Sequence, residues 1–368
     1  MAKDNPRRPG PVEKKLVGVA DTVITAAERS KDPTLAIPVR SLANANFNAR
    51  RGIIEMGKRK QARTFFNVGM AKKFMQTVLV ADALAELQRA GLTTSLREIY
   101  YRTKHTMKDS HENTFDGQNE SDPLIEDLEV ALSALREELH VRAENAGSIV
   151  GPVVLDDDGD RVDCARLGKG GYSVPSIVEP EYIEIRRCTA DFILLVEKGT
   201  QWNRLSEDKF WRRYNCVLLT GNGQPPRGVR RLARRLHDQY EIPVYVLVDN
   251  DPWGYYIYSV VKQGSINLAF ESERMAIPRA KFIGLSSADP DHYGLPRNVG
   301  IKLNDKDVAR AKELLRYPWF QKKGWPDEIK RMLSAGLKYE LDALANKDFR
   351  YLTNTYLPRK LKEKDWLD

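Results

Sequence analysis

Three carboxylates follow two apolar runs, at positions where sheet enzymes often carry their chemistry. Residues 192–196 (Phe-Ile-Leu-Leu-Val) precede Glu197, and residues 244–248 (Val-Tyr-Val-Leu-Val) precede Asp249 and Asp251. Continuous apolar runs of this length are typical of strands that are buried on both faces of a parallel sheet. Side chains that follow such strands collect at the carboxyl edge of the sheet. We therefore expect Glu197, Asp249 and Asp251 to lie together.

Converging acids of this kind predict a bound cation. Three neighbouring carboxylates repel one another strongly unless a positive charge lies among them. Hard oxygen ligands suit Mg²⁺, which keeps several waters and accepts phosphate oxygens. One acid after a strand is more often a helix cap or a solvated loop residue. The combination favours a magnesium site made of Glu197, Asp249 and Asp251.

A pair of tyrosines lies near the start of an expected helix, Ser95-Leu-Arg-Glu-Ile-Tyr-Tyr101. Arg97 and Tyr101 are four residues apart and share one helix face, whereas Tyr100 lies on the apolar side with Ile99. A free tyrosine has a pKa of about 10 and is a poor nucleophile at neutral pH. A guanidinium one turn away can hold a phosphate in line with the hydroxyl and stabilise the developing charge. Taken alone, such a pair is more often a packing feature.

A glycine-bearing stretch, Thr220-Gly-Asn-Gly-Gln-Pro-Pro-Arg227, follows one expected strand and precedes an arginine-rich helix. A flexible turn at a helix N-terminus favours phosphate, and the arginines can follow a nucleic-acid backbone. The candidates are Arg227, Arg230, Arg231 and Arg234. A single Gly-x-Gly is weak, and solvent-facing arginines are the alternative. The stretch has neither the third glycine of a dinucleotide site nor the lysine of a P-loop, so we expect no ATP site here.

The elements that precede the acids are helical. Residues 68–90 have helical spacing and end at Gly91, and Ser95 with Glu98 forms a capping box for the next helix. A third helix is expected from Asp122–Pro123 to Leu139. An extended run at 149–155 and a turn at 156–159 follow. Three short helices and a hairpin are typical of a winged helix-turn-helix domain, which places a helix at DNA.

Beyond residue 174 the pattern is α/β. Apolar runs at 192–196, 216–220, 244–248 and 282–285 alternate with helical segments such as 227–240, which predicts a parallel sheet covered on both faces. Several helices are expected in residues 305–357. The domain plan is a basic arm (1–67), a winged-helix domain (68–150) and a sheet domain (174–368).

Composition sets the outer limits. The chain has 368 residues, 42% hydrophobic, enough for two cores. No apolar run reaches 18 residues, so we expect no membrane anchor and a cytoplasmic protein. Three separated cysteines, Cys164, Cys188 and Cys216, indicate reduced thiols rather than zinc or disulfides.

The positive charge is concentrated at the N-terminus. Residues 1–65 hold 14 lysines and arginines against 6 acids, a difference of 8 that equals the net charge of the whole chain. A basic arm suits nucleic acid or an acidic partner surface, and a solvated tail is the alternative.

Two motifs together resemble a known family. A strand followed by Glu197, then a strand followed by Asp249-x-Asp251-x-x-Gly254, resembles the TOPRIM domain of topoisomerases and primases. Arg97-Glu-Ile-Tyr-Tyr101 resembles the cleavage motif of the A subunits of topoisomerase VI and of their meiotic break-forming relatives. The similarity covers about residues 68–357. It implies an α/β protein with an N-terminal winged-helix (CAP-like) domain followed by a TOPRIM domain with a parallel sheet.

The resemblance also implies roles and partners. Tyr101 would be the nucleophile, Arg97 its helper, and the three acids the Mg²⁺ ligands. The chain would form a homodimer and join two ATPase B subunits in an A2B2 heterotetramer, with ATP used by the ATPase subunits and the arm of residues 1–67 as their docking site. That assembly would be an ATP-dependent type II DNA topoisomerase, which breaks both strands of double-stranded DNA transiently, passes a second duplex and religates. An archaeal, nucleoid-associated protein is expected.

Three other functions stay open. A meiotic-type break-forming protein would share the chemistry without efficient resealing. A TOPRIM nuclease would hydrolyse DNA with water and leave no protein attached. A non-enzymatic winged-helix DNA-binding protein would need no metal.

Overall fold

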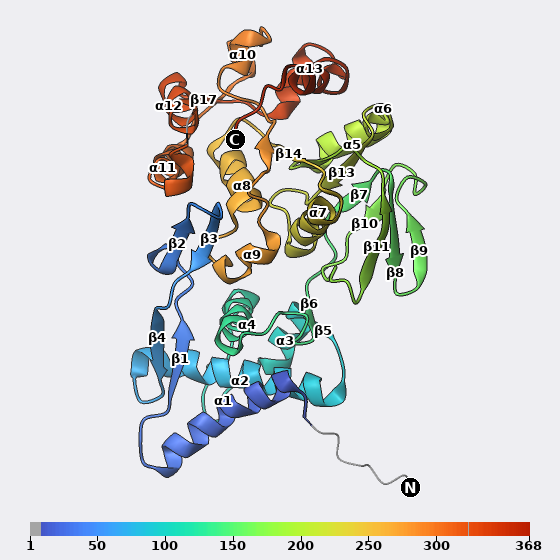
Figure 1. Ribbon diagram of the computed structural model, residues 1–368. Helices are drawn as coiled ribbons and strands as arrows, with labels where there is room; N and C mark the ends of the chain where they lie inside the picture. The colour runs from blue at the N-terminus through green and yellow to red at the C-terminus, as the bar shows by residue number, and fades with distance from the viewer. Residues whose placement is uncertain (1–8, 323) are drawn as a thin grey trace. The chain divides into compact units, whose positions relative to one another are not determined.

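Residues 9–322 and 324–368 are described by a computed structural model, and they divide into two units (Figure 1). Unit 1 takes the chain up to Asn44 and Met56–Glu144, and unit 2 takes Ala45–Glu55 and Asn145–Asp368. Each unit is described by itself below. In the described residues, no helix is long and apolar enough to cross a membrane.

Unit 1 is mainly helical. Its helices are α1 (Pro11–Glu28), α2 (Val68–Ala90), α3 (Leu96–Thr103) and α4 (Gln118–Leu132). Strands β1 (Thr34–Pro38) and β4 (Lys60–Thr64) pair antiparallel, and the two-residue strands β5 (Thr94–Ser95) and β6 (Val141–Arg142) pair parallel. The core is formed by apolar side chains of α2, α3 and α4, together with Leu16 of α1.

The N-terminal segment is more structured than we expected from its prolines and charges. Instead of an extended arm with one short helix, it forms the 18-residue helix α1, whose Leu16 is buried, and strand β1. Leu35 and Ile37 of β1 pack against Phe74 of α2. Apolar residues at helical spacing give α1 a face that packs on α2, so the segment contributes to the core. The first eight residues of the predicted arm lie outside the described residues.

Two of the helix boundary predictions are confirmed and one is wrong. Helix α2 ends at Gly91, which has the left-handed conformation (φ 64°), and Ser95 with Glu98 forms the predicted capping box of α3. Helix α4, however, begins at Gln118 rather than Asp122. It ends at Ser133, which adopts a left-handed conformation (φ 47°), so Leu139 is buried from the turns that follow and not from the helix.

The extended run that we expected as the wing of a winged-helix domain belongs to unit 2. Strand β7 (Ser148–Val150) pairs antiparallel with a strand of the main sheet. Strand β8 (Val153–Asp157) is the centre of a separate antiparallel sheet, with β9 (Asp160–Asp163) and β11 (Ile183–Cys188) at its two edges. The sequence shows the hairpin but not its partner, because β11 lies about twenty residues further along and pairing between distant strands leaves no local pattern.

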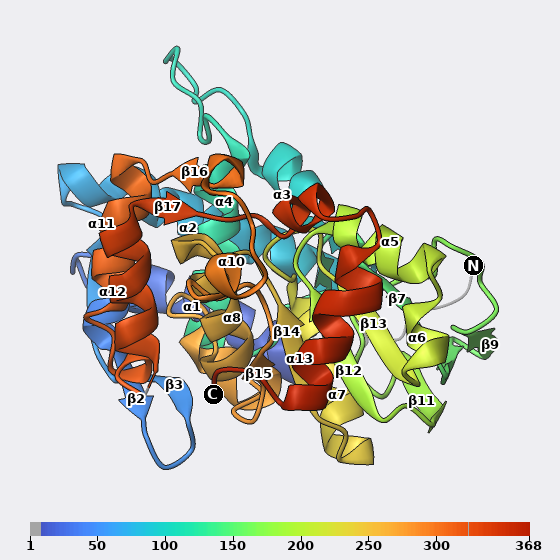
Figure 2. The same ribbon diagram turned by 90° about the horizontal axis from the view of Figure 1, so that it is seen from above.

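The main sheet of unit 2 has the order β10-β7-β13-β12-β14-β15. Strands β12 (Phe192–Val196), β13 (Cys216–Thr220), β14 (Val244–Leu247) and β15 (Lys281–Phe282) run parallel to one another, whereas β7 and β10 (Tyr172–Ser173) add an antiparallel edge. Figure 2 shows β12, β13 and β14 side by side. The predicted parallel sheet is therefore confirmed in its central strands.

Helices cover both faces of this sheet, which explains its continuous apolar strands. Every residue of β12 and β13 is buried. Alternate residues such as Leu194 and Leu218 pack in one cluster with Trp202 of α5 (Gly199–Glu207) and Phe210 of α6 (Phe210–Arg213). The residues between them point to the opposite face. Helix α7 (Arg227–Tyr240), predicted with these same bounds, also contacts β13.

The rest of unit 2 packs around the sheet. Its helices are α8 (Pro252–Gln263), α9 (Ser272–Met275), α10 (Asp289–His292), α11 (Asp305–Leu314), α12 (Trp325–Ala335) and α13 (Leu357–Glu363). Its remaining strands are the hairpin β2 (Ala45–Asn48) with β3 (Ile53–Met56), and the short pair β16 (Ile301–Lys302) with β17 (Leu337–Lys338). All three cysteines are buried and unpaired, as expected for reduced thiols.

Candidate active site

Helix α3 holds Tyr101 on its exposed face. Ser95 Oγ accepts the amide of Glu98, and the Glu98 carboxylate accepts the amide of Ser95, so the first turn is fixed at both ends. Ile99 packs into the core of unit 1, which turns the opposite face outward. Tyr101 is 61% exposed there, and the Arg97 guanidinium lies 5.9 Å from its ring centroid. The phenol is therefore accessible to a macromolecular substrate and has a cation beside it.

The preceding tyrosine is a packing residue. Tyr100 is buried, its hydroxyl accepts a hydrogen bond from Lys104 Nζ at 2.8 Å, and it donates to the Asp116 carbonyl at 3.4 Å. Both hydrogen-bonding roles of this hydroxyl are already filled by protein groups. Of the pair, only Tyr101 offers its phenol to solvent.

The sheet brings the first two predicted acids together. Strands β12 and β14 are parallel neighbours with Val196 beside Leu247, so the residues after them meet at the carboxyl edge. The amide of Glu197 donates to the Leu247 carbonyl at 3.0 Å, and the amide of Asp249 donates to the Glu197 carboxylate at 3.3 Å. Parallel register thus places Glu197 next to Asp249, as the sequence predicted.

Asp251 follows on the same loop and begins helix α8. Its Oδ1 accepts the amide of Gly254 at 2.6 Å, which makes it the N-cap of the helix. Asn250 between the two acids is buried, and its backbone exchanges two hydrogen bonds with Tyr339. Its side-chain amide donates to the Tyr255 hydroxyl at 2.6 Å. These contacts fix the acid-bearing loop.

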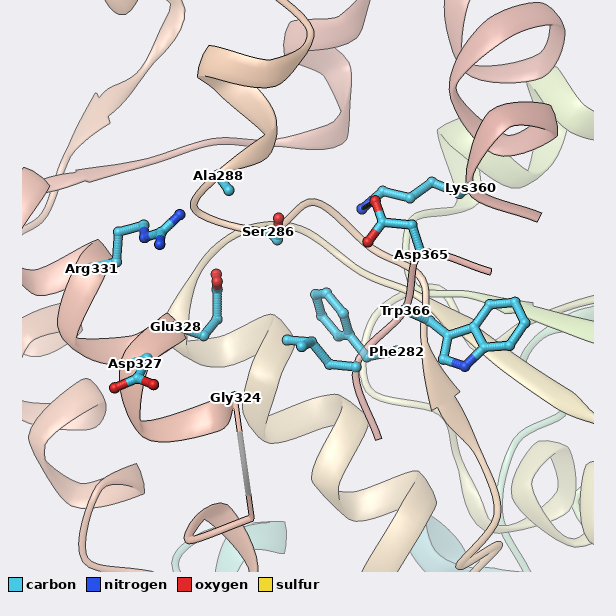
Figure 3. A pocket seen from close by; sticks show the side chains of 11 residues that line it. Phe282, Ser286, Ala288, Gly324, Asp327, Glu328, Arg331, Lys360, Asp365 and Trp366 are labelled. Carbon is cyan, nitrogen blue, oxygen red and sulfur yellow. Dashed lines mark ion pairs between the residues drawn. The ribbon is translucent and has the colours of Figure 1, made fainter. Parts of the chain in front are cut away.

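A buried glutamate supports this loop from α12. Glu328 accepts hydrogen bonds from Tyr255 and from the amide of Ser287, each at 2.5 Å. The same residue lines a cavity of about 270 Å³. Figure 3 shows Glu328 and Arg331 reaching into that cavity from α12, with Lys360 and Asp365 on its other side. One carboxylate oxygen of Glu328, Oε1, accepts the hydrogen bonds from Tyr255 and Ser287 and so supports the loop.

The three acids share one electrostatic environment. Burial, and then the charges of Asp249 and Asp251, raise the pKa of Glu197 to about 7. Burial raises the pKa of Asp249 to about 6, against the opposing effects of the Leu341 amide and Lys198. Burial also raises the pKa of Asp251. Burial is the main cause at all three acids, and repulsion between the carboxylates adds to it at Glu197.

Glu197, Asp249 and Asp251 have the right oxygen donors for a divalent cation, but their side chains are not arranged as a complete coordination site. Carboxylate oxygens are the hard ligands that Mg²⁺ takes, and a cation among these acids would relieve their repulsion and favour their ionised form. Within the described residues, however, no three His, Cys, Asp or Glu side chains are positioned to hold a metal ion together. Asp249 is bonded to Lys198 and to the Leu341 amide, and Asp251 caps α8.

Lys198 is the residue that sequence reasoning missed. Its Nζ lies 3.0 Å from Asp249, 2.8 Å from Glu340 and 2.9 Å from Asp342. Burial opposes its charge, but the bonds to these carboxylates outweigh burial and raise the pKa of Lys198. Its position directly after Glu197 is a signal that could have been used. No local pattern connects Glu340 and Asp342 with the earlier acids, because tertiary pairing of Tyr339 with Asn250 brings them in.

The glycine-bearing turn at residues 220–227 lies at the same edge of the sheet as Glu197. The amide of Gly223, which has φ of 118°, donates to the Glu197 carbonyl at 2.8 Å. A side chain at Gly221 would lie 2.4 Å from Pro225, so the turn needs glycine there. The turn therefore helps to position the backbone of Glu197.

The arginines that follow this turn are engaged within unit 2. Arg230 is buried, and burial lowers its pKa to about 10. Arg231 binds both carboxylate oxygens of Glu179, at 2.8 and 2.9 Å. Arg227 pairs with buried Glu271 at 2.6 Å, and Arg234 pairs with Asp238 at 2.6 Å. These contacts favour a structural role for Arg230 and Arg231, and DNA binding by the four arginines stays a prediction.

The fold and the acid edge thus define a Toprim-type α/β protein, and comparison with known proteins agrees. The family model of the Toprim domain shared by topoisomerase 6 A subunits and Spo11 matches residues 192–361. The model "Type IIB DNA topoisomerase" matches residues 72–141, and "All-beta domain in DNA topoisomerase VI alpha subunit" matches residues 143–189. The last range contains the small antiparallel sheet, β8, β9 and β11, that the sequence analysis did not recognise.

Whole-length relatives extend this result. The chain is 42% identical to the A subunit of a type 2 DNA topoisomerase 6 from Pyrococcus horikoshii, over 96% of this chain and 95% of the relative. It is 38% identical to that of Aeropyrum pernix, over 94% and 93% respectively. It is 35% identical to the A3 subunit of a DNA topoisomerase 6 from Oryza sativa, over 94% and 77%. The chain belongs to the family of topoisomerase 6 A subunits, the DNA-cleaving subunits of type IIB DNA topoisomerases.

Proposed function

We propose that this chain is the DNA-cleaving subunit of an ATP-dependent type II DNA topoisomerase, with Tyr101 as its nucleophile. The observation that carries the assignment of the nucleophile is the exposed phenol of Tyr101 on α3, with Arg97 on the same face. Tyr100 is unsuited to this role, because its hydroxyl is buried and bonded on both sides.

In the proposed reaction, the Tyr101 oxygen bonds to a backbone phosphorus as the bond from that phosphorus to a deoxyribose oxygen breaks. The phenol loses its proton, and the leaving oxygen gains one and becomes a free hydroxyl. Arg97 holds the phosphate and stabilises its developing charge. The phosphotyrosyl ester keeps one strand end on the protein, and attack by the freed hydroxyl reverses the reaction. Two such reactions, one per strand, make a transient double-strand break.

Glu197, Asp249 and Asp251 are the residues that would hold magnesium. The support is their burial, their raised pKa values and their hard oxygen donors. When bound, Mg²⁺ would supply charge stabilisation at the phosphate and the leaving oxygen. The chain itself contributes the fixed loop that orients the carboxylates and excludes bulk water from them.

DNA would be bound chiefly through its phosphates. We propose that α2, α3 and α4 of unit 1 act as a helix-turn-helix of the winged-helix class and present α3 to double-stranded DNA. The support is the three-helix core and the exposed, arginine-bearing face of α3. Because the proposed cleavage needs no reading of base sequence, affinity should fall steeply with salt.

Strand passage requires partners. The relatives are named as A subunits, which implies a second type of subunit, and the sequence has no nucleotide-binding motif of its own. We propose a homodimer of this chain joined by two ATPase B subunits, with ATP hydrolysed by the latter. The segment before α2 is the candidate docking site for the ATPase subunits.

A covalent-trapping experiment tests this function. The full chain is incubated with its ATPase partner, supercoiled plasmid and Mg²⁺, and the reaction is stopped with detergent. We expect linear DNA with protein attached to its ends, through a tyrosine that peptide mapping identifies as Tyr101. Linear DNA free of protein would instead indicate hydrolysis by water, and DNA binding without any cleavage would contradict an enzymatic role.

A further inference from the structure

The ammonium of Lys198 lies among carboxylates from separate parts of unit 2. It contacts Asp249 after β14, and Glu340 and Asp342 in the segment after β17, all within 3.0 Å. Its side chain is 26% exposed, whereas that of Asp249 is only 5% exposed. Lys198 is therefore partly exposed, and its ammonium links buried Asp249, a proposed metal ligand, with Glu340 and Asp342, which are more exposed.

This contact uses the second oxygen of Asp249. Oδ1 accepts the Leu341 amide at 2.7 Å, and Oδ2 bonds to Lys198 at 3.0 Å. A divalent cation on Asp249 and an ammonium on the same carboxylate would be like charges a few ångströms apart, which repel strongly where water is scarce. The backbone amide is uncharged and can stay. Lys198 is thus the group that a metal ion must displace.

Glu340 and Asp342 offer Lys198 a second binding position. The segment that carries them is fixed by the Asn250–Tyr339 backbone pair, and Asp342 also accepts a hydrogen bond from Gln201 at 2.9 Å. Lys198 can leave Asp249 and keep both of these partners, because its three donors already contact all three acids. The lysine side chain is flexible enough to make this short movement.

We propose that Lys198 is a positioning residue that acts as an internal counter-cation: it occupies Asp249 until a divalent cation binds and then retains only Glu340 and Asp342. This inference rests on the proposed function, since it needs Asp249 to be a metal ligand. Its consequence is that Lys198 weakens metal binding while it offsets part of the charge of the acid cluster when no metal is bound. Metal affinity is then set by a competition within the chain.

Metal binding by the full chain, without DNA or nucleotide, tests the competition. The free Mn²⁺ signal in electron paramagnetic resonance gives the affinity directly, and competition with Mg²⁺ extends it. We expect Lys198→Met to bind Mn²⁺ about ten-fold more tightly than the wild type, because one competing charge is removed. Lys198→Gln should show the same direction if Lys198→Met folds poorly by circular dichroism. Unchanged or weaker binding in a folded variant would overturn the proposal.

Lys338→Met is the matched control. Lys338 pairs with Asp307 at 2.9 Å and acts on Asp251 through its charge, but within the described residues it forms no ion pair with any of the three proposed metal ligands. Loss of its charge should raise Mn²⁺ affinity clearly less than loss of Lys198. An equal gain would show that net charge alone, and not competition for Asp249, sets the affinity.

A double-mutant cycle tests the second binding position. Glu340→Gln with Asp342→Asn should weaken Mn²⁺ binding in the wild type, since Lys198 then has only Asp249 as a charged partner. The same pair of changes should have a much smaller effect in the Lys198→Met background. The loss of two negative charges lowers Mn²⁺ affinity in both backgrounds. The difference between the two losses of affinity is therefore the contribution that depends on Lys198. Equal effects in both backgrounds would overturn this part of the inference.

Asp249→Asn separates the inference from the proposed function. If Asp249→Asn binds Mn²⁺ as well as the wild type, the metal site itself is wrongly assigned. If Asp249→Asn loses binding while Lys198→Met is no tighter than the wild type, the metal site stands and only the competition fails.

Discussion

The guanidinium of Arg97 lies 5.9 Å from the ring centroid of Tyr101, one helical turn away on the exposed face of α3. The helix that carries both residues is fixed by the Ser95–Glu98 capping box at its first turn and by Ile99, which is buried in the core of unit 1. In the proposed reaction, a phosphate at the phenol would therefore have this guanidinium beside it. A positive charge at this position would favour the negative charge that develops during the proposed attack.

Removing the hydroxyl group of one tyrosine at a time should identify the nucleophile. Tyr101→Phe should abolish the covalent protein–DNA complex while DNA binding and thermal stability stay near wild type, because only one exposed hydroxyl is lost. Tyr100→Phe should still cleave, with slightly lower stability from the lost bond to Lys104. Detergent-trapped complexes and melting curves measure both. Cleavage in Tyr101→Phe together with none in Tyr100→Phe would reverse the assignment.

Removal of the acids should separate cleavage from folding. Glu197→Gln and Asp249→Asn should each reduce Mg²⁺-dependent cleavage by about 100-fold or more, in the range seen when charge stabilisation at a reacting group is lost. Metal-free stability should not fall, since each change removes one charge from a crowded cluster. Plasmid cleavage against Mg²⁺ concentration measures the effect. Normal cleavage by both variants would refute the assignment of the metal site.

The cap of α3 should give the helix a characteristic response to acid. Hydrogen bonds from the Ser95 amide, and then from the Thr94 and Ser95 hydroxyls, lower the pKa of Glu98 to about 2 from the usual 4.5. A lowered folded-state pKa contributes stability above pH 4.5, and this contribution is lost as the pH falls through about 2. Wild-type α3 amides should exchange hydrogen more slowly than those of Glu98→Ala at pH 6, and the difference should shrink below pH 4.5.

An exposed glutamate outside the cap provides the control for that experiment. Glu144→Ala should leave the exchange of α3 amides unchanged at every pH. A difference between wild type and Glu98→Ala that grows on acidification would contradict the sign of the shift.

Arg230 should matter for stability rather than for DNA. Its side chain is buried in unit 2, so Arg230→Met should lower the melting temperature and leave the slope of log affinity against log salt unchanged. Fluorescence anisotropy with duplex DNA at several salt concentrations gives this slope. A slope reduced by about one would instead show that Arg230 contacts a phosphate.

A buried ion pair in unit 1 should be far more important than an exposed one. Asp127 contacts Arg63 and, at 2.7 Å, Arg40, and all three side chains are at most 10% exposed. Asp127→Ala should cost about 3–5 kcal/mol, since buried Arg63 loses its carboxylate while Arg40 keeps Glu126 as an acidic partner. Glu86→Ala, which breaks the exposed pair with Arg102, should cost less than about 1 kcal/mol. Comparable losses from the two would contradict this difference.

The sequence predicted those features of the fold that depend on residues close together in the chain. The bounds of β12, β13 and α7, the Gly91 terminus and the Ser95–Glu98 capping box are all readable because periodicity and capping act over a few residues. The proximity of Glu197 and Asp249 was also predictable, since neighbouring parallel strands end at the same edge of a sheet. Asp251 was placed on the same loop, but its N-cap contact with Gly254 required the structure.

Distant pairings escaped prediction for a physical reason. The partner of β8 is β11, and the segment with Glu340 reaches the acids through Asn250 and Tyr339. Such contacts depend on the shape of the whole unit. The arginines of α7 show the same limit: their sequence favoured phosphate, whereas Glu179 and Glu271, far along the chain, bind them in the fold. The path of residues 9–44 was predicted wrongly, because their prolines suggested an extended arm with one short helix.

The β2–β3 hairpin determines when unit 2 can finish folding during synthesis and how the two units can be separated by cleavage. Residues 45–55 belong to unit 2, although the chain on either side of them belongs to unit 1. Phe47 of the hairpin lies against Trp319, with ring centroids 5.9 Å apart, and Arg51 pairs with Glu273. On the ribosome, the hairpin emerges long before these partners and must wait for them, so unit 2 cannot finish folding from its own continuous segment. For the same reason, a single proteolytic cut at residue 144 would leave this piece of unit 2 attached to the other fragment.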